Sequence, residues 1–185
     1  GVRLTASATS PAGAGLGGSS ALLACVVGTL AHAAGRPLEP EAVRRLSQDL
    51  ETWIIHGPTG YQDYYPPLLG GCLALEGGFG GVSVERLPVD LGALSSRLRL
   101  VYTGAPHHSG ITNWGAMRAW FDGEAATVGA LQEIAGLSRE LRAALWRGDL
   151  DGACATIVAE GRVRLRMAPG IATPVIRPSA SRRMR

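Results

Sequence analysis

Residues 11–21 read Pro-Ala-Gly-Ala-Gly-Leu-Gly-Gly-Ser-Ser-Ala and lead directly into an apolar segment, 21–34. Four glycines fall within six positions of this stretch. Glycines let backbone N–H groups approach an anion, and the start of the following helix adds partial positive charge. Two serine hydroxyls at the helix start could bind phosphate or a phosphate-bound Mg²⁺. The stretch therefore predicts a phosphate-binding loop made of Gly13, Gly15, Leu16, Gly17, Gly18, Ser19 and Ser20.

Two other interpretations of this loop need weighing. In the first, the glycines only make a turn and the serines cap the helix. In the second, Gly13, Gly15 and Gly18 form the G-x-G-x-x-G dinucleotide motif, which requires a second strand ending in an acid about twenty residues later. The sequence instead continues into another helical pattern after Pro37, which disfavours the dinucleotide fold.

Composition limits the class of protein. The 185 residues are 46% hydrophobic and 18% charged, which indicates a globular chain with one core, or one domain plus part of another. All 18 basic residues are arginine, so the absence of lysine excludes a Walker P-loop and Schiff-base chemistry. Residues 162–185 hold seven arginines and no acid, whereas 1–161 hold eleven arginines and fifteen acids. This basic end could contact nucleic acid, although no aromatic residues are interleaved with the arginines.

The sequence also predicts a location. The apolar part of the uncharged stretch, 21–34, has about fourteen residues and is too short to span a bilayer. No signal-peptide pattern is present, and Cys25, Cys72 and Cys154 are far apart without metal-ligand spacing. We therefore expect a cytoplasmic protein with buried, unpaired thiols and no membrane partner.

The expected elements alternate irregularly along the chain. Period-two patterns predict strands over residues 2–9, 71–76, 81–87 and 98–103. Helical periodicity predicts helices over 21–34, 39–54, 124–147 and 150–166, the third with an apolar stripe. Because the order is strand, two helices, three strands and then helices, the fold class is α+β rather than a regular βαβ alternation.

Three further motifs follow the glycine loop in order. Glu51 precedes Thr-Gly-Tyr-Gln-Asp-Tyr at 59–64 and Leu-Gly-Gly at 69–71. Leu-Val-Tyr-Thr-Gly occupies 100–104, and the segment 165–174 contains Ala-Pro-Gly and Thr-Pro. Together with the glycine loop, these motifs resemble the GHMP kinases, in particular the sugar-kinase branch with heptose-phosphate kinases and galactokinase. Gly18 replaces a serine of the family signature and Tyr61 replaces a frequent lysine.

The resemblance implies a two-lobe fold. Residues 1–90 would form part of a ribosomal protein S5-like, ATP-binding lobe, and 91–176 part of an α/β C-terminal lobe. Residues 177–185 would be a basic tail outside the family pattern. The first and third family signatures are missing, which predicts a reading of a longer kinase truncated at both ends. Apolar surface left without its lobe would favour association of copies.

The resemblance also implies a reaction and its residues. The γ-phosphoryl group of ATP would move to a hydroxyl of a sugar or sugar phosphate, with Mg²⁺ as cofactor. Asp63 would be the catalytic carboxylate, and Ser19 and Glu51 would hold the metal. Substrate contacts are predicted at Tyr64, Tyr102 and Thr103.

Alternatives remain for these residues and for the chain. Glu51 could be an ordinary solvated acid, and Asp63 could only shape a turn. Trp114, Trp120 and Phe121 are expected in the core, and His107 and His108 in a surface loop. The rival functions are an inert nucleotide-binding fragment and, less favoured, an arginine-tailed protein that contacts nucleic acid.

Overall fold

The structure is a computed structural model that describes residues 2–102, 104 and 109–167. Within these residues it contains seven helices and one two-stranded antiparallel sheet, which agrees with an α+β class. The elements in chain order are α1 (Gly18–Ala33), α2 (Pro40–Ile55), α3 (Tyr65–Leu69), β1 (Leu73–Gly78), β2 (Gly81–Arg86), α4 (Leu91–Arg97), α5 (Ser109–Phe121), α6 (Ala125–Trp146) and α7 (Leu150–Met167).

Helices α1, α2 and α3 pack around one small core. Pro40 begins α2 at a position where its missing N–H costs nothing, and α2 ends where His56 takes a left-handed conformation with φ 52°. The apolar face of α2 meets α1, because residues three and four apart project from the same side of a helix. The buried residues of this core are Ala24, Val27 and Val43, with Leu23, Leu50 and Leu68 packed against them.

A second core joins the hairpin to the C-terminal helices. Strands β1 and β2 pair from Leu73 opposite Arg86 to Gly78 opposite Gly81. Helices α6 and α7 are connected by a short turn, in which the Asp149 carboxylate accepts a hydrogen bond from the Gly152 amide. The predicted apolar stripe of α6 supplies part of the packing. The buried members of this core are Leu87, Ala144, Leu145 and Ala153, with Cys72, Ala74, Val89, Leu141 and Leu150 around them.

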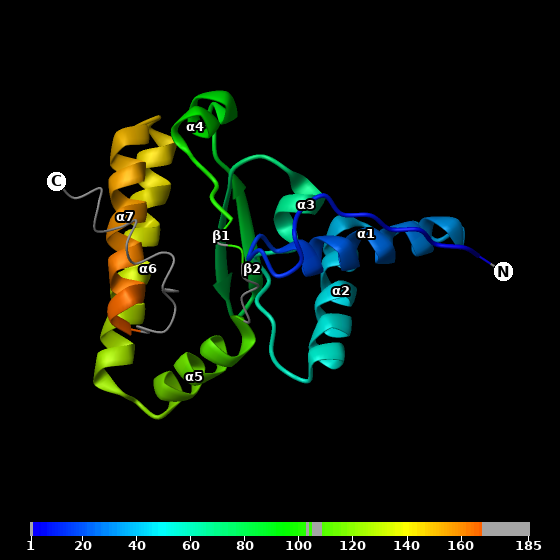
Figure 1. Cartoon of the computed structure of the whole chain (residues 1–185), viewed down its shortest axis with the longest axis horizontal. Coiled ribbons are helices and arrows are strands. Elements are labelled where there is room, and N and C mark those ends of the chain that lie inside the picture. The colour runs from blue at the N-terminus through cyan, green and yellow to red at the C-terminus, as the bar shows by residue number, and fades with distance from the viewer. Residues whose placement is uncertain (1, 103, 105–108, 168–185) are drawn as a thin grey trace.

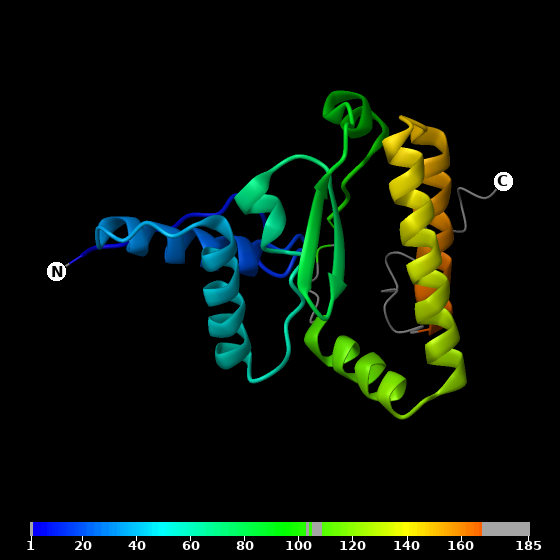
Figure 2. The same cartoon turned by 180° about the vertical axis from the view of Figure 1, so that it is seen from behind.

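The hairpin separates two helical groups. Helices α1, α2 and α3 lie on one side of it, and α6 and α7 lie side by side on the other, as both views show (Figures 1 and 2). In space, helix α5 begins near one end of the hairpin and runs toward the start of α6 (Figure 1). This arrangement places the glycine loop, α2 and the segment before α3 together, on the side of the hairpin opposite α6 and α7.

Two predicted strands are wrong. Residues 2–9 form no strand and are exposed, and the described residues 98–102 form none either. A strand needs a hydrogen-bonded neighbour, and within the described residues the sheet consists of β1 and β2 alone. Residues 91–97, which the sequence left unassigned, form α4, because the Asp90 carboxylate caps its start by accepting from the amides of Gly92 and Ala93.

Two burial predictions are also wrong. Trp114, Trp120 and Phe121 on α5 are exposed rather than in the core. All three cysteines are free, as predicted, but Cys25 is exposed, while Cys72 and Cys154 are half-buried. Separately, none of the helices over the described residues is both long and apolar enough to cross a membrane.

Candidate active site

Three residues of the glycine loop take the left-handed backbone conformation. Gly13, Gly15 and Gly17 have φ values of 70°, 72° and 68°, in the left-handed region that favours glycine. Gly17 is the N-cap of α1, and no side chain caps that helix end. An added Cβ at Gly15 would meet no atom within 4 Å, so the loop faces open space there. Such a loop can direct backbone N–H groups at an anion at the positive end of α1.

The two serines do not cap the helix; their hydroxyls turn toward α2. Ser19 Oγ donates to Glu51 Oε1 at 2.8 Å, and Ser20 Oγ donates to Glu51 Oε2 at 2.8 Å. Ser20 is buried. The capping interpretation of the serines is therefore wrong, and Glu51 is not an ordinary solvated acid.

Tyr64 completes the surroundings of Glu51. Its side chain is fully buried, and its hydroxyl donates to Glu51 Oε2. Burial, followed by this hydrogen bond to the Glu51 carboxylate, raises the pKa of Tyr64 to about 12. The carboxylate thus accepts from three hydroxyls, contributed by α1 and by the segment before α3. We call Glu51, Ser19, Ser20 and Tyr64 the carboxylate cluster.

Asp63 lies against the glycine loop. A Cβ added at Gly17 would be 3.2 Å from both Cβ and Cγ of Asp63. Partial burial, and then the negative charge of Glu51, raise the pKa of Asp63 above its usual 3.8. A carboxyl with a raised pKa therefore borders the predicted phosphate-binding loop, and only a residue without a side chain at position 17 allows this approach comfortably.

The segment that carries Asp63 is tied to α2 by residues that the sequence did not single out. Gln48 Nε2 donates to the Thr59 carbonyl at 3.0 Å, and Thr52 Oγ1 lies 3.2 Å from Thr59 Oγ1. Gln48, Glu51 and Thr52 are three and four positions apart on α2. This spacing, which places the polar residues on one side of the helix, is the sequence signal by which they could have been found.

Of the other predicted site residues, only Tyr102 lies within the described part of the chain. Tyr102 lies on the exposed segment after α4. Thr103, His107, His108 and the motif at 168–174 lie outside the described residues. A groove of about 750 Å³ between the hairpin and α6 is lined, among the described residues, by none of the predicted site residues.

The oxygen atoms of the carboxylate cluster could contribute to a Mg²⁺ site. Over the described residues, no group of three or more His, Cys, Asp or Glu side chains could hold a metal ion. Mg²⁺ commonly takes few protein ligands and completes an octahedron with phosphate oxygens and waters, at about 2.1 Å from each. Neighbouring ligands of such an octahedron are about 3 Å apart. The 2.8 Å between Ser19 Oγ and Glu51 Oε1 fits that edge.

Comparison with known proteins bears on the first part of the chain. Residues 1–71 match the family model of the GHMP kinases N terminal domain. This match confirms the predicted resemblance at the level of the GHMP superfamily and supports an ATP-dependent kinase of the GHMP type. The matched segment contains the glycine loop, the carboxylate cluster and Asp63. No curated protein matches the chain.

Proposed function

We propose that this chain carries the ATP-binding and acceptor-activating residues of a GHMP-type sugar kinase. The reaction would transfer the γ-phosphoryl group of ATP to a hydroxyl of a sugar or sugar phosphate. The observation that supports it most is the position of Asp63, whose carboxyl meets Gly17 of the glycine loop and has a raised pKa. A loop that binds phosphates and a group that handles the acceptor proton must be neighbours for phosphoryl transfer.

The glycine loop would bind the phosphates of ATP. Its backbone N–H groups and the uncapped start of α1 supply positive partial charge without any lysine. Charge develops on the transferred group and on the leaving oxygen during the reaction, so fixed donors at this place lower the barrier.

Asp63 would orient the acceptor hydroxyl and accept its proton. A general base works best when its pKa is near the ambient pH, and partial burial moves the pKa of Asp63 in that direction. The negative charge of Glu51 acts in the same sense.

Ser19 and Glu51 would hold Mg²⁺ when ATP is bound. The ion would supply neutralisation of the phosphate charge. Tyr64 and Ser20 keep the Glu51 carboxylate in place by donating to Oε2, which leaves Oε1 with Ser19 as the pair of oxygens offered to a metal.

The sugar acceptor is proposed from the resemblance of residues 59–64 and 69–71 to the sugar-kinase branch. The two-lobe division at residue 90 and the substrate contacts of Tyr102 and Thr103 are proposals of the same kind. Tyr64, also predicted as a substrate contact, is fully buried and donates to Glu51, so it is not proposed for that role.

The test is binding followed by turnover. Calorimetric titration of the 185-residue chain with Mg·ATP is expected to show saturable binding, with Mg·NADH as the negative control. Release of ADP is then measured with a panel of sugars and sugar phosphates. Asp63→Asn is expected to keep ATP binding and lose turnover, whereas Asp49→Asn, the same change at an exposed site on α2, should keep both.

Each contrary result has a distinct meaning. ATP binding without turnover on any acceptor would identify the inert nucleotide-binding fragment. Full turnover by Asp63→Asn would remove Asp63 from the catalytic role. A folded chain that does not bind Mg·ATP would reject the proposed function.

A further inference from the structure

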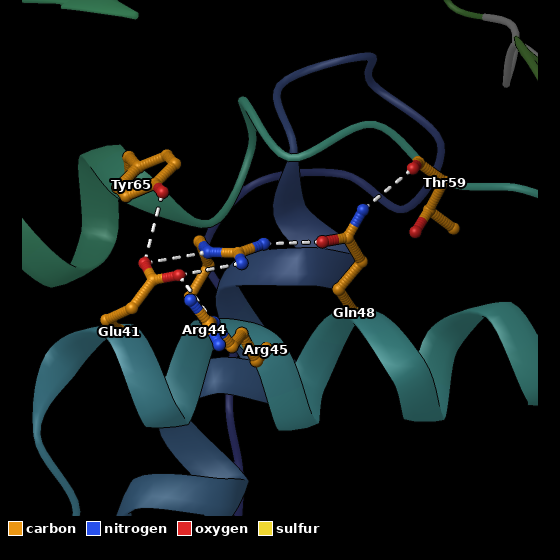
Figure 3. Close-up of polar contacts among 6 residues, drawn as sticks. All are labelled: Glu41, Arg44, Arg45, Gln48, Thr59 and Tyr65. Carbon is orange, nitrogen blue, oxygen red and sulfur yellow. Dashed lines mark hydrogen bonds and ion pairs between the residues drawn. The ribbon is translucent and has the colours of Figure 1, made fainter. Parts of the chain in front are cut away.

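A nearly buried arginine on α2 is surrounded by polar partners. Arg44 donates from Nε to Glu41 Oε2 at 2.9 Å and from Nη2 to Glu41 Oε1 at 2.8 Å, and its Nη1 donates to Gln48 Oε1. Only 9% of its side chain is exposed. A guanidinium at this depth needs such partners, because an uncompensated buried charge is costly. The helix therefore holds Arg44 in one orientation (Figure 3).

The partners of Arg44 form hydrogen bonds with residues both before and after Asp63 in the sequence. On one side, Gln48 Nε2 donates to the carbonyl of Thr59, four residues before Asp63. On the other, the Tyr65 hydroxyl donates to Glu41 Oε2 at 3.1 Å, and the Tyr65 ring lies 5.5 Å from Arg44 Cζ. Figure 3 shows Thr59 and Tyr65 at opposite ends of this group, with Arg44 between them.

Gln48 accepts one hydrogen bond and donates another, and an amide side chain can do both. Its carbonyl oxygen accepts from the Arg44 cation while its amide nitrogen donates to a backbone carbonyl. A glutamate of almost the same shape would still accept from Arg44, but it would have no proton to donate to Thr59. The carboxylate oxygen that replaces the amide nitrogen would instead face the Thr59 carbonyl oxygen, and both atoms carry negative partial charge.

We propose that Gln48 is a positioning residue, which joins the fixed Arg44 guanidinium to the Thr59 carbonyl and thereby holds the segment 57–63 so that Asp63 meets Gly17. This inference rests on the proposed function for its catalytic consequence. Gln48 is half-buried on α2, and its contacts are to Arg44 and Thr59 rather than to the glycine loop. Its replacement should therefore disturb turnover more than ATP binding.

The test compares Gln48→Glu with Gln132→Glu, the same change at an exposed position of α6. In the full chain, we expect Gln48→Glu to lower kcat by about 10- to 100-fold, because displacing a reacting group by about 1 Å can cost that much. The Kd of Mg·ATP should change by less than about threefold, and circular dichroism should show an unchanged helix content. Hydrogen exchange followed by mass spectrometry should be faster in peptides covering 57–65. Gln132→Glu should alter none of these quantities.

The outcomes separate this inference from the proposed function. If the parent chain turns over and Gln48→Glu matches it in kcat and exchange, the positioning role is rejected and the kinase proposal stands. If the parent chain shows no turnover, the proposed function fails, and exchange alone decides the inference: faster exchange at 57–65 supports positioning and unchanged exchange overturns it. An equal loss of ATP binding and kcat would assign Gln48 to general structural support and would also overturn it.

Discussion

Removing one hydroxyl from the carboxylate cluster should measurably destabilise the chain. Tyr64→Phe keeps the buried ring and deletes only the donor to Glu51 Oε2. A hydrogen bond to a charged group contributes about 1.5–3 kcal/mol net. Because Ser19 and Ser20 continue to donate to Glu51, the loss should be about 2 kcal/mol. With a urea m-value of about 2 kcal/mol/M, the unfolding midpoint should fall by about 1 M.

The assay is urea unfolding of the full chain, monitored by circular dichroism. Tyr102→Phe is the matched control, because Tyr102 is 49% exposed. This substitution should change the free energy of unfolding by less than about 0.5 kcal/mol. The partner is tested in a double-mutant cycle with Glu51→Gln. A neutral amide accepts a weaker hydrogen bond, so Tyr64→Phe should cost only about 1 kcal/mol in that background.

Two results would refute this reasoning. One is a Tyr64→Phe midpoint that equals the Tyr102→Phe midpoint, since the buried hydroxyl would then contribute nothing. The other is an unchanged cost of Tyr64→Phe in the Glu51→Gln background, which would mean that the hydroxyl does not act through the Glu51 carboxylate.

Three further predictions concern the surroundings of Asp63 and Glu41. Gly17→Ala and Gly15→Ala both place a side chain at positive φ, which costs roughly 1 kcal/mol each, but only Gly17→Ala meets Asp63 at 3.2 Å. Gly17→Ala should therefore lower the unfolding free energy more than Gly15→Ala, and equal losses would argue against the close approach. Because the pKa of Asp63 is raised on folding, the native state binds its proton more tightly and stability falls as the pH rises through that pKa. Asp63→Asn should thus increase the melting temperature at pH 7 and not below pH 3.8, and a gain that is the same at both pH values would contradict this. The hydrogen bond from Arg44 lowers the pKa of Glu41 from 4.5 to about 2, so its stabilisation is present above pH 4.5 and is lost as the pH falls toward 2. Glu41→Gln should remove that part of the acid dependence, which melting curves between pH 2 and pH 6 would detect.

Local patterns predicted many elements well. The helix predicted over 39–54 is Pro40–Ile55, and the one over 124–147 is Ala125–Trp146. Helical periodicity is a repeated local signal, and capping residues and prolines mark its limits. The strand predicted at 81–87 is also present, as Gly81–Arg86, because it pairs with a neighbour close in sequence.

Sequence patterns whose outcome depends on distant packing partners gave wrong predictions. Residues 2–9 alternate as a strand should, yet alternation alone does not supply the hydrogen-bonded neighbour that a strand requires. Trp114, Trp120 and Phe121 share a helix, but the direction of their side chains depends on what packs against α5. Residues of this size are usually buried, so the sequence favoured the core.

The sequence by itself determined the glycine loop, the helix after it and the types of side chain available for phosphoryl transfer, because these depend on residues adjacent in the chain. Only the tertiary structure decided that both serines donate to Glu51, 32 and 31 residues away. It likewise decided that Asp63 rests on Gly17 and that Gln48 connects Arg44 to Thr59. These contacts follow from how α1, α2 and the segment before α3 pack. Packing is set by the fit of whole surfaces, which no local pattern encodes.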